Sequence, residues 1–122
     1  RLRNTRASER AVVAGLNCAF ALRADPSSLV ALVEGIRRGP SPRDALLGEL
    51  RWAALANPAS GQTALLVGRQ DDVTIWDSGQ SGMVLGADDT VRLLGDQVLE
   101  RTYYLVLADS PQEAKRFRVL GE

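Results

Sequence analysis

Histidine is absent from this 122-residue sequence, and cysteine occurs once, at Cys18. Without histidine the chain has no Ser-His-Asp or Cys-His nucleophile, no imidazole acid–base catalyst and no ligand set of the usual zinc sites. A single cysteine excludes an internal disulfide framework and a thiolate metal site, and it fits a reducing, cytoplasmic compartment. We therefore expect no enzymatic activity, no bound metal and no cofactor.

Motifs for nucleotide binding and serine catalysis are also absent. No P-loop occurs, and no Gly-x-Gly-x-x-Gly turn opens a helix after a strand. The segment Gly79–Gly82 is similar to a serine-nucleophile turn, but Met83 stands where that motif needs glycine. Asp71–Asp72 and Asp88–Asp89 match no calcium-loop spacing and are typical of turns. An enzyme that uses aspartate or tyrosine with a metal is thus only a third alternative.

Net charge and long apolar runs are the next features that the chain lacks. Its 15 basic and 15 acidic residues balance, which predicts no general attraction to nucleic acid or to an anionic membrane. The run over residues 11–22 is too short to span a bilayer, which needs about 20 residues. It follows a basic segment, so a targeting segment and a buried core helix are both open. In the second case Cys18 is buried and reacts slowly.

Helix-start signals occur repeatedly in the first half. Asn4 or Thr5 is suited to cap a helix that runs to about residue 23, and Asp25-Pro26 starts a second helix to about residue 38. Ser41-Pro42 starts a third, which ends before Asn57-Pro58. The sequence therefore predicts a helical part over about residues 4–57.

The second half has the alternation and the turn residues of β-strands. We expect strands at 63–67, 73–76, 83–85, 90–94 and 98–107, joined by turns at 68–72, 77–82, 88–89 and 95–96. Ser110-Pro111 begins either a short helix or a loop before a final edge strand, and both readings of 110–120 stay open. The expected fold is a single α+β domain over 1–122, with a β-rich part at about 62–120. In it, two or three N-terminal helices pack on one face of a four- to five-stranded antiparallel sheet.

The longest predicted strand supplies the candidate site. Side chains alternate between its faces, and the face of Tyr103 is the more apolar, so we assign it to the core beneath the helices. Tyr104, Thr102 and Glu100 are then expected on the outer face, where an aromatic residue with polar neighbours is typical of an interface.

These observations predict a non-enzymatic protein–protein interaction or assembly domain. The domain is expected to be a subunit or regulatory module of a larger, bacterial-type complex, with a protein partner or a second copy of the chain bound to it. All basic residues except Lys115 are arginine, which is the cation enriched at interfaces. The alternative is a small-molecule sensor with a pocket between helices and sheet, which Arg69, Arg92 and Arg101 would support by pointing inward.

Overall fold

The computed structural model describes residues 1–3, 5, 12–21, 30–33, 36–38, 47–70, 72–77 and 83–122 of the chain. Strands dominate these ranges, and helix is confined to residues 111–121. The elements are β1 (Leu2–Arg3), β2 (Val12–Ala21), β3 (Val30–Val33), β4 (Ile36–Arg38), β5 (Leu47–Leu50), β6 (Trp52–Ala56), β7 (Thr63–Gly68), β8 (Val73–Asp77), β9 (Met83–Leu93), β10 (Val98–Leu99), β11 (Tyr103–Ala108), α1 (Pro111–Arg116) and the 3-10 helix η2 (Phe117–Gly121).

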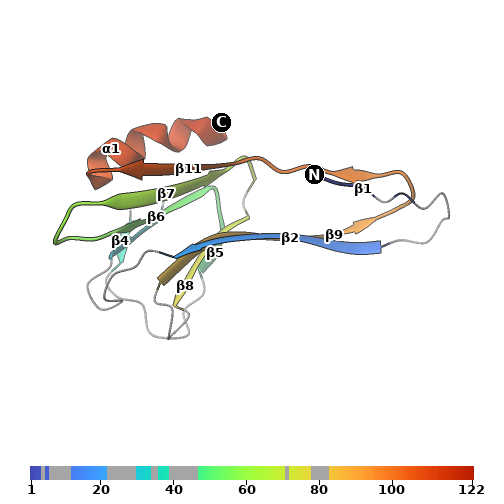
Figure 1. Cartoon of the computed structure of the whole chain (residues 1–122), viewed down its shortest axis with the longest axis horizontal. Helices are drawn as coiled ribbons and strands as arrows, with labels where there is room; N and C mark the ends of the chain where they lie inside the picture. The colour runs from blue at the N-terminus through green and yellow to red at the C-terminus, as the bar shows by residue number, and fades with distance from the viewer. Residues whose placement is uncertain are drawn as a thin grey trace.

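The strands form a β-sandwich with a helical layer on one side (Figure 1). One sheet has the order β11-β7-β6-β3-β4 and the other the order β2-β9-β8-β5, and all the paired strands are antiparallel. The middle strands β6 and β7 contact β8 and β9 across the sandwich, while α1 lies on the opposite face of β6, β7 and β11.

Two apolar cores separate these layers. Between the sheets, alternate residues of β6 and β7, including Leu55 and Leu66, pack with β8 and β9. Under the helix, the residues between them, including Trp52 and Leu65, pack with Ala114 of α1. Every residue of β6 and β7 is therefore buried, because a strand between two layers has no solvent-facing side.

The expected α+β fold with N-terminal helices is wrong. The described parts of the three predicted helices contain strands β2 to β6 and no helix, while the signals at Asp25-Pro26 and Ser41-Pro42 lie outside the described residues. The physical reason is clear at Trp52–Ala56, where alanine and leucine favour helix locally. Burial on both faces overrides that preference, and a doubly buried strand has the same continuous apolar run as a buried helix.

Several predicted strands are confirmed, but their pairing differs. The segments 63–67 and 73–76 correspond to β7 and β8, which belong to different sheets and do not form a hairpin. The segments 83–85 and 90–94 belong to the single strand β9, because Asp88 and Asp89 pair with Asn17 and Leu16 of β2. The predicted strand 98–107 is divided at residues 100–102 into β10 and β11.

The carboxyl-terminal segment adopts the helical alternative. Ser110 caps α1, since its Oγ accepts a hydrogen bond from the Glu113 backbone N–H at 3.2 Å, and Pro111 fills the first turn. The Asp109 backbone N–H donates to Glu113 Oε2 at 3.4 Å, close to the reciprocal contact of a capping box. Further along, Gly121 is buried against the Gly68 carbonyl, so η2 closes over the end of β7.

An arm extends from the sandwich on the right of Figure 1. Beyond Ala87, β9 leaves β8 and pairs with β2 alone among the described strands. There β1 pairs with β10, with Leu2 opposite Leu99. The name arm is used below for residues 1–3, 12–17 and 88–99. The turn at its tip is the predicted one, with Asp96 at a positive φ of 61° and the Gln97 N–H donating to the Leu94 carbonyl at 3.2 Å.

Candidate interaction surface

A polar pocket lies where the arm joins the sandwich. There the chain passes from β10 to β11 through residues 100–102, beside the loop that follows β7. The pocket has a volume of about 240 Å³, and we call it the neck pocket. It is lined by Arg69, Gln70, Asp72, Glu100, Arg101, Thr102 and Tyr103.

The best-defined polar contact in the neck pocket joins Tyr103 and Asp72. The Tyr103 hydroxyl donates to Asp72 Oδ2 at 2.6 Å, the short distance expected for a carboxylate acceptor. The Tyr103 ring packs against the core between the sheets, so the first residue of β11 holds the loop after β7. Asp72 Oδ1 is buried and accepts no hydrogen bond from the described residues.

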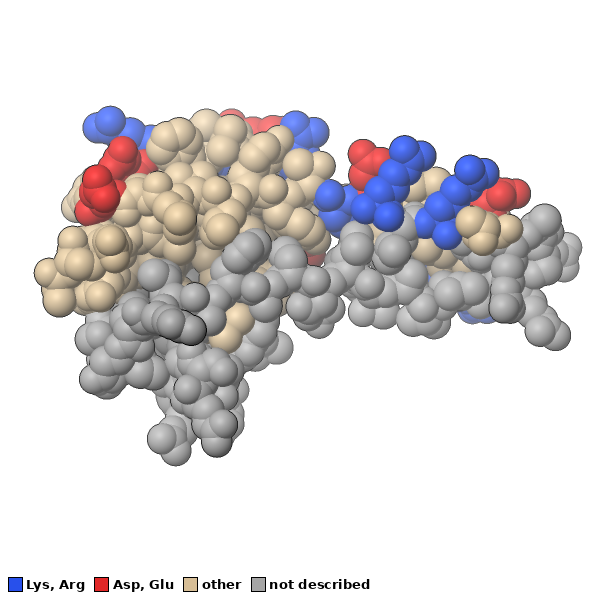
Figure 2. All heavy atoms as spheres, in the orientation of Figure 1, with Lys and Arg blue, Asp and Glu red and all other residues tan. Residues whose placement is uncertain are grey.

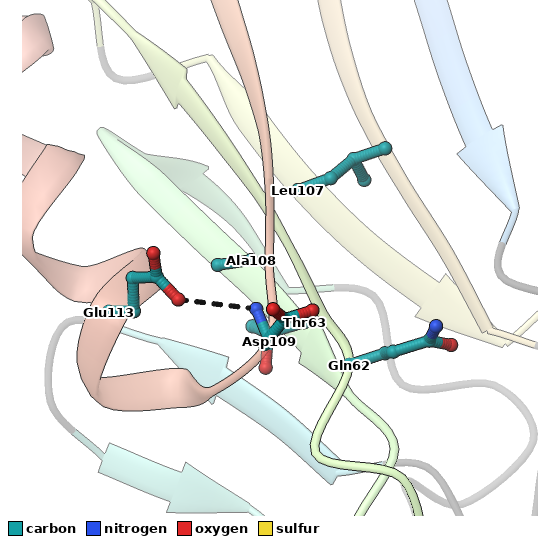
Figure 3. A pocket seen from close by; sticks show the side chains of 6 residues that line it. All are labelled: Gln62, Thr63, Leu107, Ala108, Asp109 and Glu113. Carbon is teal, nitrogen blue, oxygen red and sulfur yellow. Dashed lines mark hydrogen bonds between the residues drawn. The ribbon is translucent and has the colours of Figure 1, made fainter.

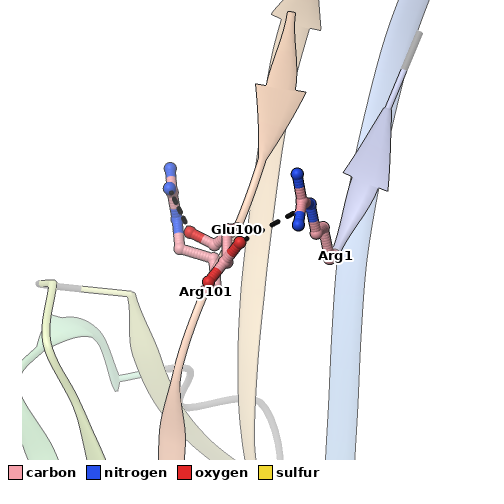
Figure 4. Close-up of polar contacts among 3 residues, drawn as sticks. All are labelled: Arg1, Glu100 and Arg101. Carbon is pink, nitrogen blue, oxygen red and sulfur yellow. Dashed lines mark hydrogen bonds and ion pairs between the residues drawn. The ribbon is translucent and has the colours of Figure 1, made fainter. Parts of the chain in front are cut away.

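Charged groups of both signs surround the neck and the arm. Arg1 Nε lies 3.6 Å from Glu100 Oε2, and Arg101 Nη1 donates to the Glu100 carbonyl at 3.0 Å (Figure 4). Arg3 Nη2 lies 3.4 Å from Asp96 Oδ1 near the tip. Figure 2 shows blue and red side chains next to each other along this upper side of the arm. Because these pairs are exposed, they add little stability, about 0–1 kcal/mol each, and leave the arm a mixed-charge surface.

Aliphatic side chains are exposed along the outer strand of the sandwich. β11 is the last strand of the five-stranded sheet, and Leu105 and Leu107 are 41% and 75% exposed. A second pocket, of about 300 Å³, lies at the end of β11. Figure 3 shows Leu107 and Gln62 on one side of β11, with Glu113 and the helix on the other.

The three predicted interface residues do not share one face. Glu100 and Thr102 are exposed and line the neck pocket. Tyr104 is half-buried and packs against the core under the helix, whereas Tyr103 reaches the core between the sheets. The expectation that helices cover the Tyr103 face and leave Tyr104 outward is therefore wrong. The helix at 111–121 covers the Tyr104 face, and it follows β11 instead of preceding the sheet.

The sensor alternative places a pocket between helices and sheet, and the helical segment that packs there in the structure is the carboxyl-terminal one. Trp52, Leu65, Val67 and Ala114 fill that layer. A pocket of about 350 Å³ remains at its end, lined by Arg51, Trp52, Arg118, Gly121 and Glu122. Of the three arginines that would support the sensor by pointing inward, Arg69 and Arg101 line the neck pocket, and Arg92 is exposed on β9. Within the described ranges no cluster of three potential ligands could hold a metal, and no helix is long and apolar enough to cross a bilayer.

Comparison with protein families, with curated proteins and with solved structures found no match to this chain. Sequence reasoning missed the contact between Tyr103 and Asp72, which are 31 residues apart. It also missed the arm. One signal in the sequence could have indicated the arm. The uncharged stretch Val12–Ala21 is long enough to form a strand that extends beyond the other strands of its sheet.

Proposed function

We propose that this chain is a non-enzymatic assembly subunit that contacts a protein partner through its arm. The arm itself carries the proposal. It projects beyond the sandwich (Figure 1), and two aliphatic side chains at its end, Leu94 and Val98, are 49% and 40% exposed. Exposed apolar side chains gathered on a projecting element are typical of a protein contact.

The burial of the described residues near the tip of the arm supports the same proposal. Over residues 92–99, Leu93 and Leu99 are buried, whereas Leu94 and Val98 are exposed. Complete burial of an aliphatic side chain that is otherwise exposed to water contributes about 1.5–3 kcal/mol. A partner that covers Leu94 and Val98 would therefore gain favourable apolar burial at the tip.

The charge pattern favours a protein partner over nucleic acid. Arg1 and Arg3 on the arm are each placed beside an acid, Glu100 and Asp96. Among the described residues of the arm, a surface of mixed sign offers no continuous basic stripe to follow a phosphate backbone, but it can match a protein surface of complementary pattern. The subunit is proposed to act in the cytoplasm, on the ground of its single cysteine.

Site-specific photocrosslinking in the source cells tests the proposal. A photoreactive phenylalanine at position 94 is expected to yield a discrete crosslinked product with one protein. The matched control is the same group at Val119, which is 54% exposed on η2 and is not part of the arm. Equal labelling from both positions, or a smear from position 94, would contradict a contact made by the arm.

A small-molecule sensor is the second candidate, and the neck pocket favours it. There two arginines and the Asp72–Tyr103 pair surround about 240 Å³, which is slightly less than the usual range of about 300–1,000 Å³ for ligand sites. Native mass spectrometry of the purified chain distinguishes the candidates. A bound small molecule lost on Arg69→Ala would favour the sensor, whereas a bare chain that crosslinks from position 94 favours the assembly subunit.

A further inference from the structure

We propose that β11 is a self-association edge, at which the β11 strands of two copies pair antiparallel and join their five-stranded sheets. This inference concerns a different surface from the arm and does not depend on it. An edge strand presents unpaired backbone N–H and C=O groups that can be satisfied by another strand. β11 is such an edge in the described part of the chain, and its ladder with β7 continues without a bulge from Tyr103 to Ala108.

The sequence of β11 lacks several features that prevent edge pairing in other sheets. Charged side chains, proline and bulges protect most exposed edges, and Tyr103–Ala108 has neither a charge nor a proline. The other end of the same sheet contrasts with it, because β4 is only three residues long and ends with Arg37 and Arg38. One edge of this sheet is thus protected and the other is open.

The residues around Leu105 are complementary to themselves in one register. If two antiparallel β11 strands are centred on Leu105, each Leu105 faces its copy and each Leu107 faces Tyr103 of the other copy. The exposed leucines would then be covered by apolar side chains on both copies. Because the symmetry axis is perpendicular to the sheet, both helices would lie on the same face, where they cover the Tyr104 side.

Charge complementarity selects a second copy as the occupant of this edge. The uncharged strand is flanked by the basic Arg101 and the acidic Asp109. The register centred on Leu105 places Arg101 of each copy directly opposite Asp109 of the other, and directly opposed side chains lie within about 5.5 Å at Cβ. Arg101 already donates to the Glu100 carbonyl and has a further contact within the chain, and a guanidinium with five donors can bind a carboxylate in addition to its existing partners. Parallel pairing would instead place like charges together.

Sedimentation of the purified full chain tests the proposal. The wild type is expected at twice its 13.2 kDa mass in the micromolar range. Leu105→Lys would place two ammonium groups opposite each other and is expected to weaken the dimer at least tenfold. Val119→Lys, at another exposed aliphatic side chain, is the matched control and is expected to leave the dimer unchanged. A monomeric wild type, or a dimer that survives Leu105→Lys, would overturn the proposal.

Exchanging the two charges that flank β11 distinguishes loss of strand pairing from unfolding of the chain. A variant on the arm then distinguishes a dimer formed through β11 from one formed through the arm. Arg101→Asp and Asp109→Arg are each expected to weaken the dimer at least fivefold, and the double variant is expected to recover it, which a misfolded protein could not do. A double variant no better than either single one refutes the register. Leu94→Gln on the arm is expected to leave the dimer intact. Loss of the dimer in that variant alone would overturn edge pairing and favour self-association through the arm.

Discussion

Tyr103→Phe isolates the contact that ties β11 to the loop after β7. The change removes one hydroxyl and keeps the ring against the sandwich core. The lost bond is the 2.6 Å donation to Asp72 Oδ2, and Oδ1 of the same carboxylate is buried without a hydrogen bond from the described residues. The variant therefore leaves a partly buried carboxylate without this hydroxyl donor.

The expected loss is modest but measurable. A hydrogen bond to a charged group contributes about 1.5–3 kcal/mol, and both residues are only half-buried, which places this one at the lower end. A loss of about 1.5 kcal/mol corresponds to a Tm lower by roughly 5 °C for a domain of this size.

Urea unfolding at neutral pH of four proteins tests the contact: the wild type, Tyr103→Phe, Asp72→Ala and the double variant. If Tyr103 and Asp72 stabilise the fold through their hydrogen bond, the double variant loses less free energy of unfolding than the two single variants together. The difference, which is the coupling energy, is expected to be about 1 kcal/mol or more. Additivity within about 0.5 kcal/mol would refute the reasoning, because independent sites behave that way. A Tyr103→Phe variant as stable as the wild type would refute it directly.

Three further changes test the packing of the sandwich and its helix. Leu55→Ala removes a side chain with 0% exposure and is expected to lower the free energy of unfolding by about 2–5 kcal/mol. Leu50→Ala, at the half-buried margin of the same core, is expected to lower it less, and equal losses in urea melts would contradict this core. Gly121→Ala places a Cβ 2.6 Å from the Gly68 carbonyl oxygen and is expected to lower stability by about 1–3 kcal/mol. An unchanged Tm would contradict the packing of η2 against the end of β7. Ser110→Ala is expected to cost about 0.5–2 kcal/mol through loss of the helix cap and Ser110→Thr much less, and similar melts for the two variants would contradict capping.

The elements that could be predicted are those with a local cause. The Gly95-Asp96 turn, the strands at 63–67 and 73–76 and the capping signal at Ser110 depend on residues within a few positions of each other. The N-terminal helices failed for the opposite reason. In Trp52–Ala56 the local preference of alanine and leucine is for helix, and only the two layers that cover this strand decide otherwise.

The candidate site was predictable only in part, for a related reason. Glu100 and Thr102 were expected to be exposed, and both are. The outward position of Tyr104 depended on which face of β11 the helix covers. Alternation shows that two faces differ but does not show which layer lies on each. Contacts such as that between Tyr103 and Asp72 depend on how the sheets are stacked, which no short stretch of sequence contains.

The two proposed surfaces lead to different kinds of assembly. Pairing of β11 with the β11 of another copy is isologous, because both chains contribute the same surface. Neither chain then has a free β11 edge, so the assembly stops at a dimer. If the partner of the arm is another copy of the chain and the arm docks on a different surface of it, the contact is heterologous, and such contacts build rings or filaments. A subunit with both surfaces would therefore add as a dimer that presents two arms related by the twofold axis. In such an assembly, Leu105→Lys would lower the number of arms per building unit from two to one without altering either arm, because Leu105 lies on the sandwich and not on the arm.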